Sequence, residues 1–390
     1  MIIVAKPYVS PLLAETLSNW NIPVLLAEEV EIPAEGPLRI LSPEDFRTRY
    51  LDGRQPLLTN SENAQGVLER WFADHPLVQT VSIFKDKARF RRWLADVFPR
   101  FYYREVSLED LQEMDKDAIP FPVIVKPAVG YASLGVYRVA EPDAWDSVIQ
   151  RIERDMEEAR ALYPAAVLNT GRFIVEEWIA GEEYAIDCYY AADGQPVVLG
   201  LYKRMFAHAG DTSDRIYFTG KQVIREALDK VHAFLAEIGA KGQFSLVPLH
   251  VEVRITPKGD VVPIEVNPLR FAGIGTADLG YYALGINVYD HFFRQTRPDW
   301  EAIVQNLDDA VYSFFCAELP VTLNATRIER IDEAALRSHF REILVYRDML
   351  AYDPTTFAVL FYRSENMEEN ERLLQLDLTQ FVRVKAPVQL

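Results

Sequence analysis

Residues 250–270 read His250-Val-Glu-Val-Arg-Ile-Thr-Pro-Lys-Gly-Asp-Val-Val-Pro-Ile-Glu-Val-Asn-Pro-Leu-Arg270. Polar and apolar residues alternate in both halves, and Pro257-Lys-Gly-Asp260 lies between them. Alternation with a period of two is typical of half-buried strands, and a Pro- and Gly-containing turn between two such runs predicts a β-hairpin. We therefore expect strands over residues 250–255 and 261–266.

The polar face of this hairpin carries two carboxylates. Glu252 lies in the first strand, and Glu265 shares a face of the second strand with Asn267. If the polar faces coincide, two carboxylates and an amide oxygen converge, and such hard ligands suit Mg²⁺, which takes further oxygens from water and phosphate. Alternation alone favours another interpretation, a solvated face on a one-sided hairpin. The following Pro-Leu-Arg270 argues against it, because it breaks the strand where the polar pair ends.

The composition is that of an ordinary globular protein. The chain has 390 residues, 49% of them hydrophobic and 25% charged, which is enough for two or three domains. A formal net charge of -17 argues against nucleic-acid binding by bulk electrostatics, so local cations must meet any bound anion. No run reaches the ~18 apolar residues of a membrane span, and the N-terminus lacks a signal-peptide pattern. Two cysteines, Cys188 and Cys316, make no disulfide framework, so we expect a cytoplasmic protein without a membrane partner.

The first 80 residues alternate strand and helix signals. Residues 11–20 have helical spacing of their apolar side chains, and Asn60-Ser61 is a candidate cap for a second helix. Alternating strands and helices predict a small parallel sheet. The expected strands cover residues 2–5, 22–26, 38–41 and 56–59.

A lysine ends a buried strand in Val123-Ile-Val-Lys-Pro127, and Gly130, Ser133 and Gly135 follow it. The cation and free backbone N–H groups of such a loop can hold phosphate. The Walker pattern is absent, and an ordinary loop with a solvated lysine explains the segment equally well.

Three further segments are weak signals by themselves. Lys87 follows Asp86, a candidate N-cap, at the start of a helix. The strand that carries Glu176 runs into an acidic turn, and Lys203-Arg204 closes a strand over residues 197–202. Solvated loops and strand ends account for each of the three.

The order of these segments resembles the ATP-grasp superfamily over residues 83–295, and the hairpin with Glu265-Val-Asn-Pro-Leu-Arg270 is most similar to its carboxylate–amine ligases. The resemblance implies an α/β fold with a Rossmann-like N-terminal domain, a two-subdomain ATP-grasp domain and a C-terminal α/β extension. The implied bounds are residues 1–82, 83–300 with a flexible lid at about 120–180, and 301–390.

The resemblance also implies a role for each candidate residue. Lys87 and Lys126 would hold the α- and β-phosphates of ATP, and the loop with Gly130, Ser133 and Gly135 would close over the β- and γ-phosphates. Glu176 would face the adenine amino group, the backbone of Glu177 and Ile179 would pair with the ring, and Glu183 would bind the ribose. Lys203, or Arg204 in its place, would reach the γ-phosphate. Glu252, Glu265 and Asn267 would hold two Mg²⁺, for which Mn²⁺ could substitute, and Arg270 would stabilise the acyl phosphate or the tetrahedral species.

The implied activity is ATP-dependent carboxylate–amine ligation through an acyl phosphate, with release of ADP and phosphate. Its partners would be a small-molecule carboxylate and an amine, amino acids or peptides among them, and a homodimer is compatible with the sequence. A kinase or other phosphoryl transferase is one alternative, because the same fold serves several acceptors. A non-catalytic nucleotide-binding scaffold is another, although the intact set of acidic residues and cations argues against it.

Overall fold

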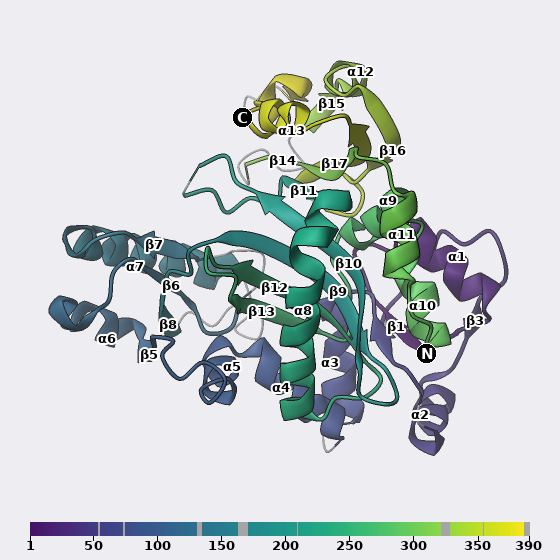
Figure 1. Ribbon diagram of the computed structural model, residues 1–390, viewed down its shortest axis with the longest axis horizontal. Coiled ribbons are helices and arrows are strands. Elements are labelled where there is room, and N and C mark those ends of the chain that lie inside the picture. Colours follow the sequence, from purple (N-terminus) through teal and green to yellow (C-terminus); the bar gives the residue numbers. More distant parts are fainter. Residues whose placement is uncertain are drawn as a thin grey trace, which may run out of the picture. The chain divides into compact units, whose positions relative to one another are not determined.

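The computed structural model describes residues 1–53, 55–72, 75–130, 135–162, 171–208, 210–320, 328–353 and 355–385 (Figure 1). They form two compact units. The larger unit contains residues 1–73, 182–207 and 214–390, and the smaller unit contains residues 74–181 and 208–213. No helix in the described ranges is long and apolar enough to cross a membrane.

The larger unit begins with a four-stranded parallel sheet in the order β3-β2-β1-β4. Ser10 and Ser42 cap the first two helices, because each side-chain oxygen accepts a backbone N–H of the first turn. The predicted Rossmann-like start is thus confirmed. Its elements are β1 (Ile2–Val4), α1 (Pro11–Asn19), β2 (Pro23–Leu26), β3 (Arg39–Ile40), α2 (Pro43–Asp52), β4 (Leu58–Thr59) and α3 (Glu62–Trp71).

The centre of the larger unit is an eight-stranded antiparallel sheet in the order β13-β12-β9-β10-β11-β14-β17-β16. Its last three strands come from the C-terminal residues, which therefore continue the same sheet as the predicted hairpin. The strands are β9 (Glu182–Tyr190), β10 (Pro196–Met205), β11 (Ile216–Thr219), β12 (Val247–Ile255), β13 (Val261–Pro268), β14 (Val311–Glu318), β16 (Glu342–Asp348) and β17 (Thr356–Ser364). A separate pair joins β15 (Ile328–Ile331) to β18 (Val382–Val384).

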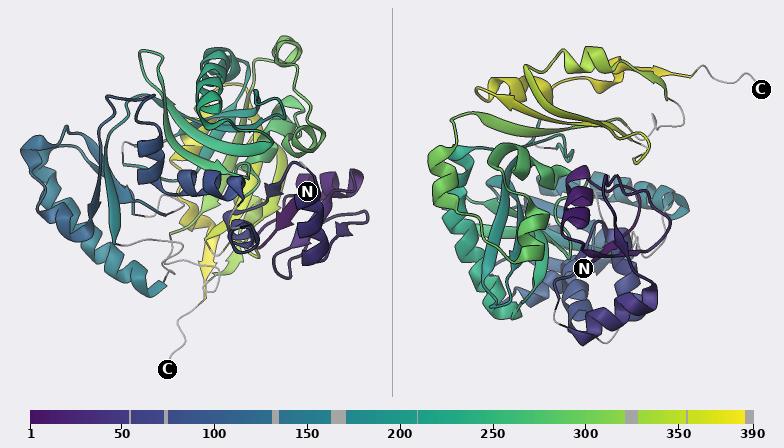
Figure 2. Two further views of the ribbon diagram at one scale, coloured as in Figure 1. Left: turned by 90° about the horizontal axis from the view of Figure 1, so that it is seen from below. Right: turned by 90° about the vertical axis from the view of Figure 1, so that its right-hand side faces the viewer.

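Helices cover both faces of this sheet. The long helix α8 (Lys221–Gly242) lies along one face (Figure 1), where the Tyr190 hydroxyl donates to the Leu235 carbonyl over 2.7 Å. Tyr189 points to the other face and packs against Phe292. On that side α1 contacts α10. The N-terminal residues, in purple, lie beside green helices in the right-hand view of Figure 2. The remaining helices are η3 (Thr276–Asp278), α9 (Leu279–Leu284), α10 (Val288–Arg294), α11 (Trp300–Asn306), α12 (Glu333–Arg337), α13 (Glu368–Leu374) and η6 (Leu378–Phe381).

The smaller unit is built on a four-stranded antiparallel sheet in the order β5-β8-β6-β7. One face buries Val125 and Val175 against Trp145 of α7, and the other face lies against Ala88 of α5 through Ile174. The elements are α4 (Pro76–Lys85), α5 (Lys87–Trp93), β5 (Tyr103–Ser107), α6 (Leu108–Gln112), η1 (Lys116–Ala118), β6 (Val123–Pro127), β7 (Tyr137–Val139), η2 (Pro142–Ala144), α7 (Trp145–Leu162) and β8 (Arg172–Glu177).

Candidate active site

The predicted hairpin is confirmed, and its polar residues face one another. Strands β12 and β13 pair antiparallel, with Glu252 opposite Glu265 and His250 opposite Asn267. Directly opposed residues of two strands share a face and lie within side-chain reach. The Glu252 side chain is 24% exposed, and Asn267 is buried. Two carboxylates and an amide therefore meet at one place on the sheet.

The electrostatics of this pair fit a divalent cation. Burial, and next the charge of Glu265, raises the pKa of Glu252 to about 7. Among the described residues no group of three or more His, Cys, Asp and Glu side chains is placed to hold a metal. Mg²⁺ needs no such group, since it is bound through one or two carboxylates with water and phosphate oxygens. Glu252, Glu265 and Asn267 have the donor set to hold it.

The raised pKa of Glu252 gives a testable pH dependence. Its carboxyl group holds a proton in the folded state between pH 4.5, its ordinary pKa, and about 7. Raising the pH through this window should destabilise the metal-free protein by up to about 3 kcal/mol, because the partly buried pair must then carry both charges. Thermal unfolding in chelator should show wild type losing stability relative to Glu252→Gln from pH 5 to 8. If the stability of the two proteins changes with pH in the same way, the repulsion between Glu252 and Glu265 is ruled out. Glu342→Gln, a control far along the chain from the hairpin, should show the same pH dependence as wild type.

Asp187 and His250 form a second layer beside the pair. Asp187 is fully buried, and its Oδ1 accepts the Nδ1–H of His250 over 2.9 Å and the backbone N–H of Ala272 over 2.8 Å. The other ring nitrogen, Nε2, lies 3.7 Å from Oε1 of Glu252. The Asp187 carboxylate thereby fixes the orientation of the His250 ring beside Glu252. Sequence reasoning missed Asp187, although it is a charged residue inside a strand whose neighbours are apolar.

Arginines flank the acidic pair on the same sheet face. Arg254 follows two residues after Glu252 and pairs with Glu183 over 3.0 Å. Arg204 of β10 pairs with Glu183 over 2.8 Å and with Asp214 over 3.1 Å. Both arginines and Glu183 are buried. Glu183, the expected ribose ligand, is therefore held by two guanidinium groups.

Lys203 points away from this face. Strand β10 continues through Met205, so Lys203 and Arg204 lie inside the strand and point to opposite faces. Lys203 pairs with Glu182 and lies 5.8 Å from the ring of Tyr184, on the face that α8 covers. The structure brings Arg204, the alternative cation, to the acidic pair.

The end of β13 is tied to the N-terminal part of the larger unit. Gln65 of α3 donates to the Pro268 carbonyl over 2.6 Å. Arg270 pairs through Nη2 with Glu62 over 2.8 Å and donates through Nη1 to the Phe271 carbonyl over 3.1 Å. The expected reaction-site arginine is thus placed at the start of α3.

The smaller unit contains a buried triad of charges. Glu176 of β8 pairs with Lys126 of β6 and, over 2.8 Å, with Nε of Arg91 from α5. All three side chains are buried. Burial acts to raise the pKa of Glu176, but Arg91 and Lys126 outweigh it and lower this pKa to about 2, whereas burial lowers the pKa of Lys126. Glu176 therefore holds Lys126 in place. Arg91, the third residue of this triad, was not predicted from the sequence.

The expected phosphate loop is described only in part. Nζ of Lys87 donates to the Gly130 carbonyl over 3.0 Å, and the Lys87 backbone N–H donates to Ala128. Gly135 has a φ of +74°, a backbone conformation that favours glycine. Ser133 lies outside the described residues. Lys87 and the start of the loop are thus in contact, as a shared phosphate role requires.

The first two residues of the expected adenine segment, Glu176 and Glu177, lie in strand β8, inside its sheet. Strand β8 lies between β5 and β6, and the backbone N–H of Glu177 donates to the Tyr102 carbonyl over 3.0 Å. Burial raises the pKa of the Glu177 carboxyl. Ile179 lies two residues beyond the end of the strand. The sequence could not show that β8 has partners on both sides.

Comparison with known proteins finds the same fold in several solved structures. Residues 119–278 match the family model of the ATP-grasp domain. The chain is similar to an L-amino acid ligase from Bacillus licheniformis at 15% identity, with 98% of each chain covered and a TM-score of 0.63. An N5-carboxyaminoimidazole ribonucleotide synthetase from Thermotoga maritima matches at 11% identity, with 98% of this chain and 99% of that chain covered and a TM-score of 0.63. No curated protein sequence matches the chain. At identities this low, the structural similarity establishes the fold alone.

Proposed function

We propose that the chain, whose residues 119–278 match the model of the ATP-grasp domain, is an ATP-dependent carboxylate–amine ligase. It would form an amide or peptide bond through an acyl phosphate and release ADP and phosphate. The observation that carries the proposal is the acidic pair, Glu252 opposite Glu265, with Asn267 on the same face and Arg204 nearby. The pair gives metal ligands and the arginine gives a cation for phosphate, which is what phosphoryl transfer requires.

The chemistry follows from the poor reactivity of a carboxylate, whose leaving group would be oxide. Its oxygen attacks the γ-phosphorus of ATP, the bond to the bridging oxygen breaks, and ADP leaves. An amine then attacks the acyl carbon, loses a proton and expels phosphate. Bound Mg²⁺ would supply positive charge against the phosphates. Arg204 would meet the γ-phosphate, Arg270 the acyl group, and Lys126, held by Glu176, a phosphate of the nucleotide.

The two cations of β10 can be told apart by substitution. Arg204→Lys keeps the charge but loses the planar fork that joins Glu183 and Asp214, so kcat/KM for ATP should fall about 10²-fold. Lys203→Met should change it by less than about threefold, because Lys203 points to the opposite face. Steady-state ADP release measures both, and thermal unfolding checks that each variant is folded. If Lys203→Met lowers kcat/KM for ATP more than Arg204→Lys does, Lys203 and not Arg204 is the residue that binds the γ-phosphate.

A coupled assay tests the proposed activity. The protein is incubated with Mg-ATP and pools of amino acids or peptides, and ADP and free phosphate are measured together. A ligase gives both products in equal amounts, and only when an acid and an amine are present. ADP without free phosphate would identify a kinase, and tight ATP binding without turnover in any pool would identify a scaffold.

A further inference from the structure

The N-terminal sheet reverses its winding direction between β1 and β4. The chain builds β2 and β3 on one side of β1 and then returns to place β4 on the other side. In open parallel sheets such a switch point opens a crevice outside the carboxyl ends of the strands, and ligands bind there. The residues that follow β1 and β4 are therefore the first place to look for a substrate.

Those residues are fixed to one another by side chains. Asn60, which follows β4, donates to the carbonyls of Ala5 and Tyr8 over 2.7 and 2.9 Å and accepts the Ala5 N–H over 2.9 Å. Asn63 donates to the Lys6 carbonyl over 3.2 Å. Asn60 therefore fixes the loop after β1, while Ser61 at the N-cap of α3 makes no side-chain cap bond.

The end of β13, the strand that carries Glu265 and Asn267, reaches the same edge. The Leu269 carbonyl accepts the backbone N–H of Thr59 over 2.6 Å, and Leu269 has a φ of +63°, a strained value for leucine. This backbone turn directs Arg270 to the first residue of α3, Glu62, which it meets at 2.8 Å. The side chains are 15% and 38% exposed, so solvent reaches the pair. A cation and an anion thus stand together at the switch point.

We propose that Arg270 and Glu62 form the subsite of an α-amino acid whose carboxylate is activated, an inference that rests on the proposed ligase function. Arg270 binds the carboxylate and Glu62 binds the ammonium. An amino acid carries both groups on one carbon, and the side chains that would receive them are in contact. A simple carboxylate would meet Arg270 but be repelled by Glu62, so the pair discriminates against acids without an amino group.

Glu62 also decides which amine reacts. An ammonium bound to a carboxylate keeps its proton, and a protonated amine has no lone pair for attack on an acyl phosphate. The α-amino group of the activated amino acid is thereby prevented from reacting. The nucleophile must be the amine of a second molecule, and the product is an amide or dipeptide with a free N-terminus.

The test uses hydroxylamine as the amine, since it traps an acyl phosphate as a hydroxamate whatever the natural second substrate is. Each of the 20 proteinogenic L-amino acids is compared with its deamino acid. Wild type should give hydroxamate with at least one amino acid and prefer it to the deamino acid by about 10–100-fold in kcat/KM. Glu62→Gln should raise the KM of the amino acid about 10–100-fold and change the KM of ATP by less than about threefold. Glu62→Asp, which keeps the charge, should retain most of the preference.

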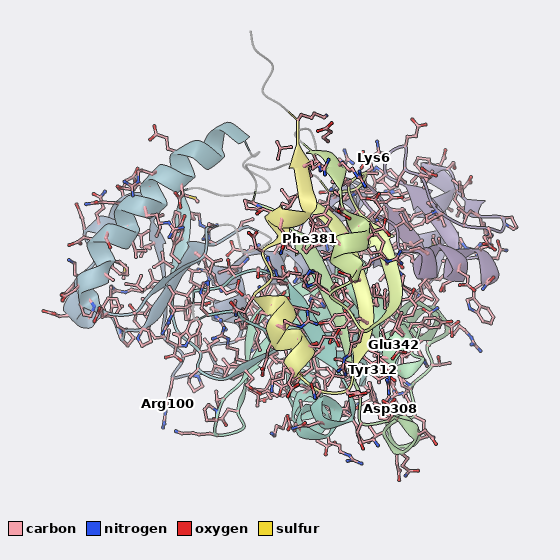
Figure 3. All side chains as sticks on the ribbon, turned by 90° about the horizontal axis from the view of Figure 1, so that it is seen from above. Lys6, Arg100, Asp308, Tyr312, Glu342 and Phe381 are labelled. Atoms are coloured by element: carbon pink, nitrogen blue, oxygen red, sulfur yellow. The ribbon has the colours of Figure 1, made fainter. Side chains whose placement is uncertain are left out.

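The matched control is Glu342→Gln. Glu342 forms a partly exposed pair with Arg363 over 3.2 Å. It lies well apart from Lys6, which marks the switch point, in Figure 3. It should behave as wild type. Wild type that prefers the deamino acids, or Glu62→Gln with an unchanged preference, overturns the subsite while ADP release leaves the ligase proposal intact. The absence of ADP release with any acid overturns the ligase proposal itself, and the subsite with it.

Discussion

Replacing Glu265 with glutamine should lower ATP turnover by more than about 10²-fold. Glu265 faces Glu252 across the hairpin, and the amide would remove one of the two charges that hold Mg²⁺. Loss of an outer partner of a metal ligand alone costs about 10–100-fold, so loss of a ligand should cost more. Steady-state ADP release at saturating ATP, repeated over a Mg²⁺ titration, measures the effect.

The control for Glu265→Gln is its own stability. Removing one carboxylate relieves the repulsion that raises the pKa of Glu252, so the metal-free variant should unfold at the same or a higher temperature than wild type. An inactive but stable protein supports the metal assignment. Full activity in Glu265→Gln would rule that assignment out.

Replacing Glu176 with glutamine should destabilise the smaller unit by about 3–5 kcal/mol. The change leaves Lys126 and Arg91 buried without their counterion, and removal of one partner from a buried ion pair has a cost of this size. Hydrogen exchange of the β6 and β8 amides measures it locally, and this avoids assuming that the two units unfold together.

Glu105→Gln is the matched change in the same sheet. Glu105 also pairs with arginines, Arg92 and Arg172, but its side chain is 26% exposed, so its loss should cost at most about 1 kcal/mol. Equal effects of the two variants would contradict the buried triad. Because the pKa of Glu176 is lowered to about 2, its stabilisation should persist above pH 4.5 and disappear as the pH falls toward 2.

The sequence predicted those parts of the site that depend on local pattern. Alternation and a turn were enough for the hairpin, and with them for the meeting of Glu252 and Glu265. The direction of the Lys203 side chain could be predicted only if the end of β10 was known. That strand continues three residues beyond the predicted end at Tyr202. A strand end is set by pairing with neighbours, which a local pattern does not contain.

Side-chain partners that lie far apart in the sequence could not be predicted for the same reason. Asp187 was visible as a charge in an apolar strand, but its bonds to His250 and Ala272 join residues 63 and 85 positions away. The pairing of Arg91 with Glu176 spans 85 positions. The C-terminal strands join the central sheet through the pairing of β11 with β14, and no sequence motif predicts this pairing. The domain boundaries at 82 and 300 stay predictions.

The most direct test of the ligase proposal follows an oxygen atom. If a carboxylate is activated as an acyl phosphate, one of its oxygens must leave with the phosphate when the amine attacks. The protein is supplied with Mg-ATP, hydroxylamine and L-amino acids labelled with ¹⁸O in the carboxylate, and the phosphate is examined by mass spectrometry. The proposal predicts one ¹⁸O atom in each phosphate released. Phosphate without ¹⁸O would mean that water attacks ATP, and a stable phosphorylated product without free phosphate would mean a kinase; either result contradicts the proposed function.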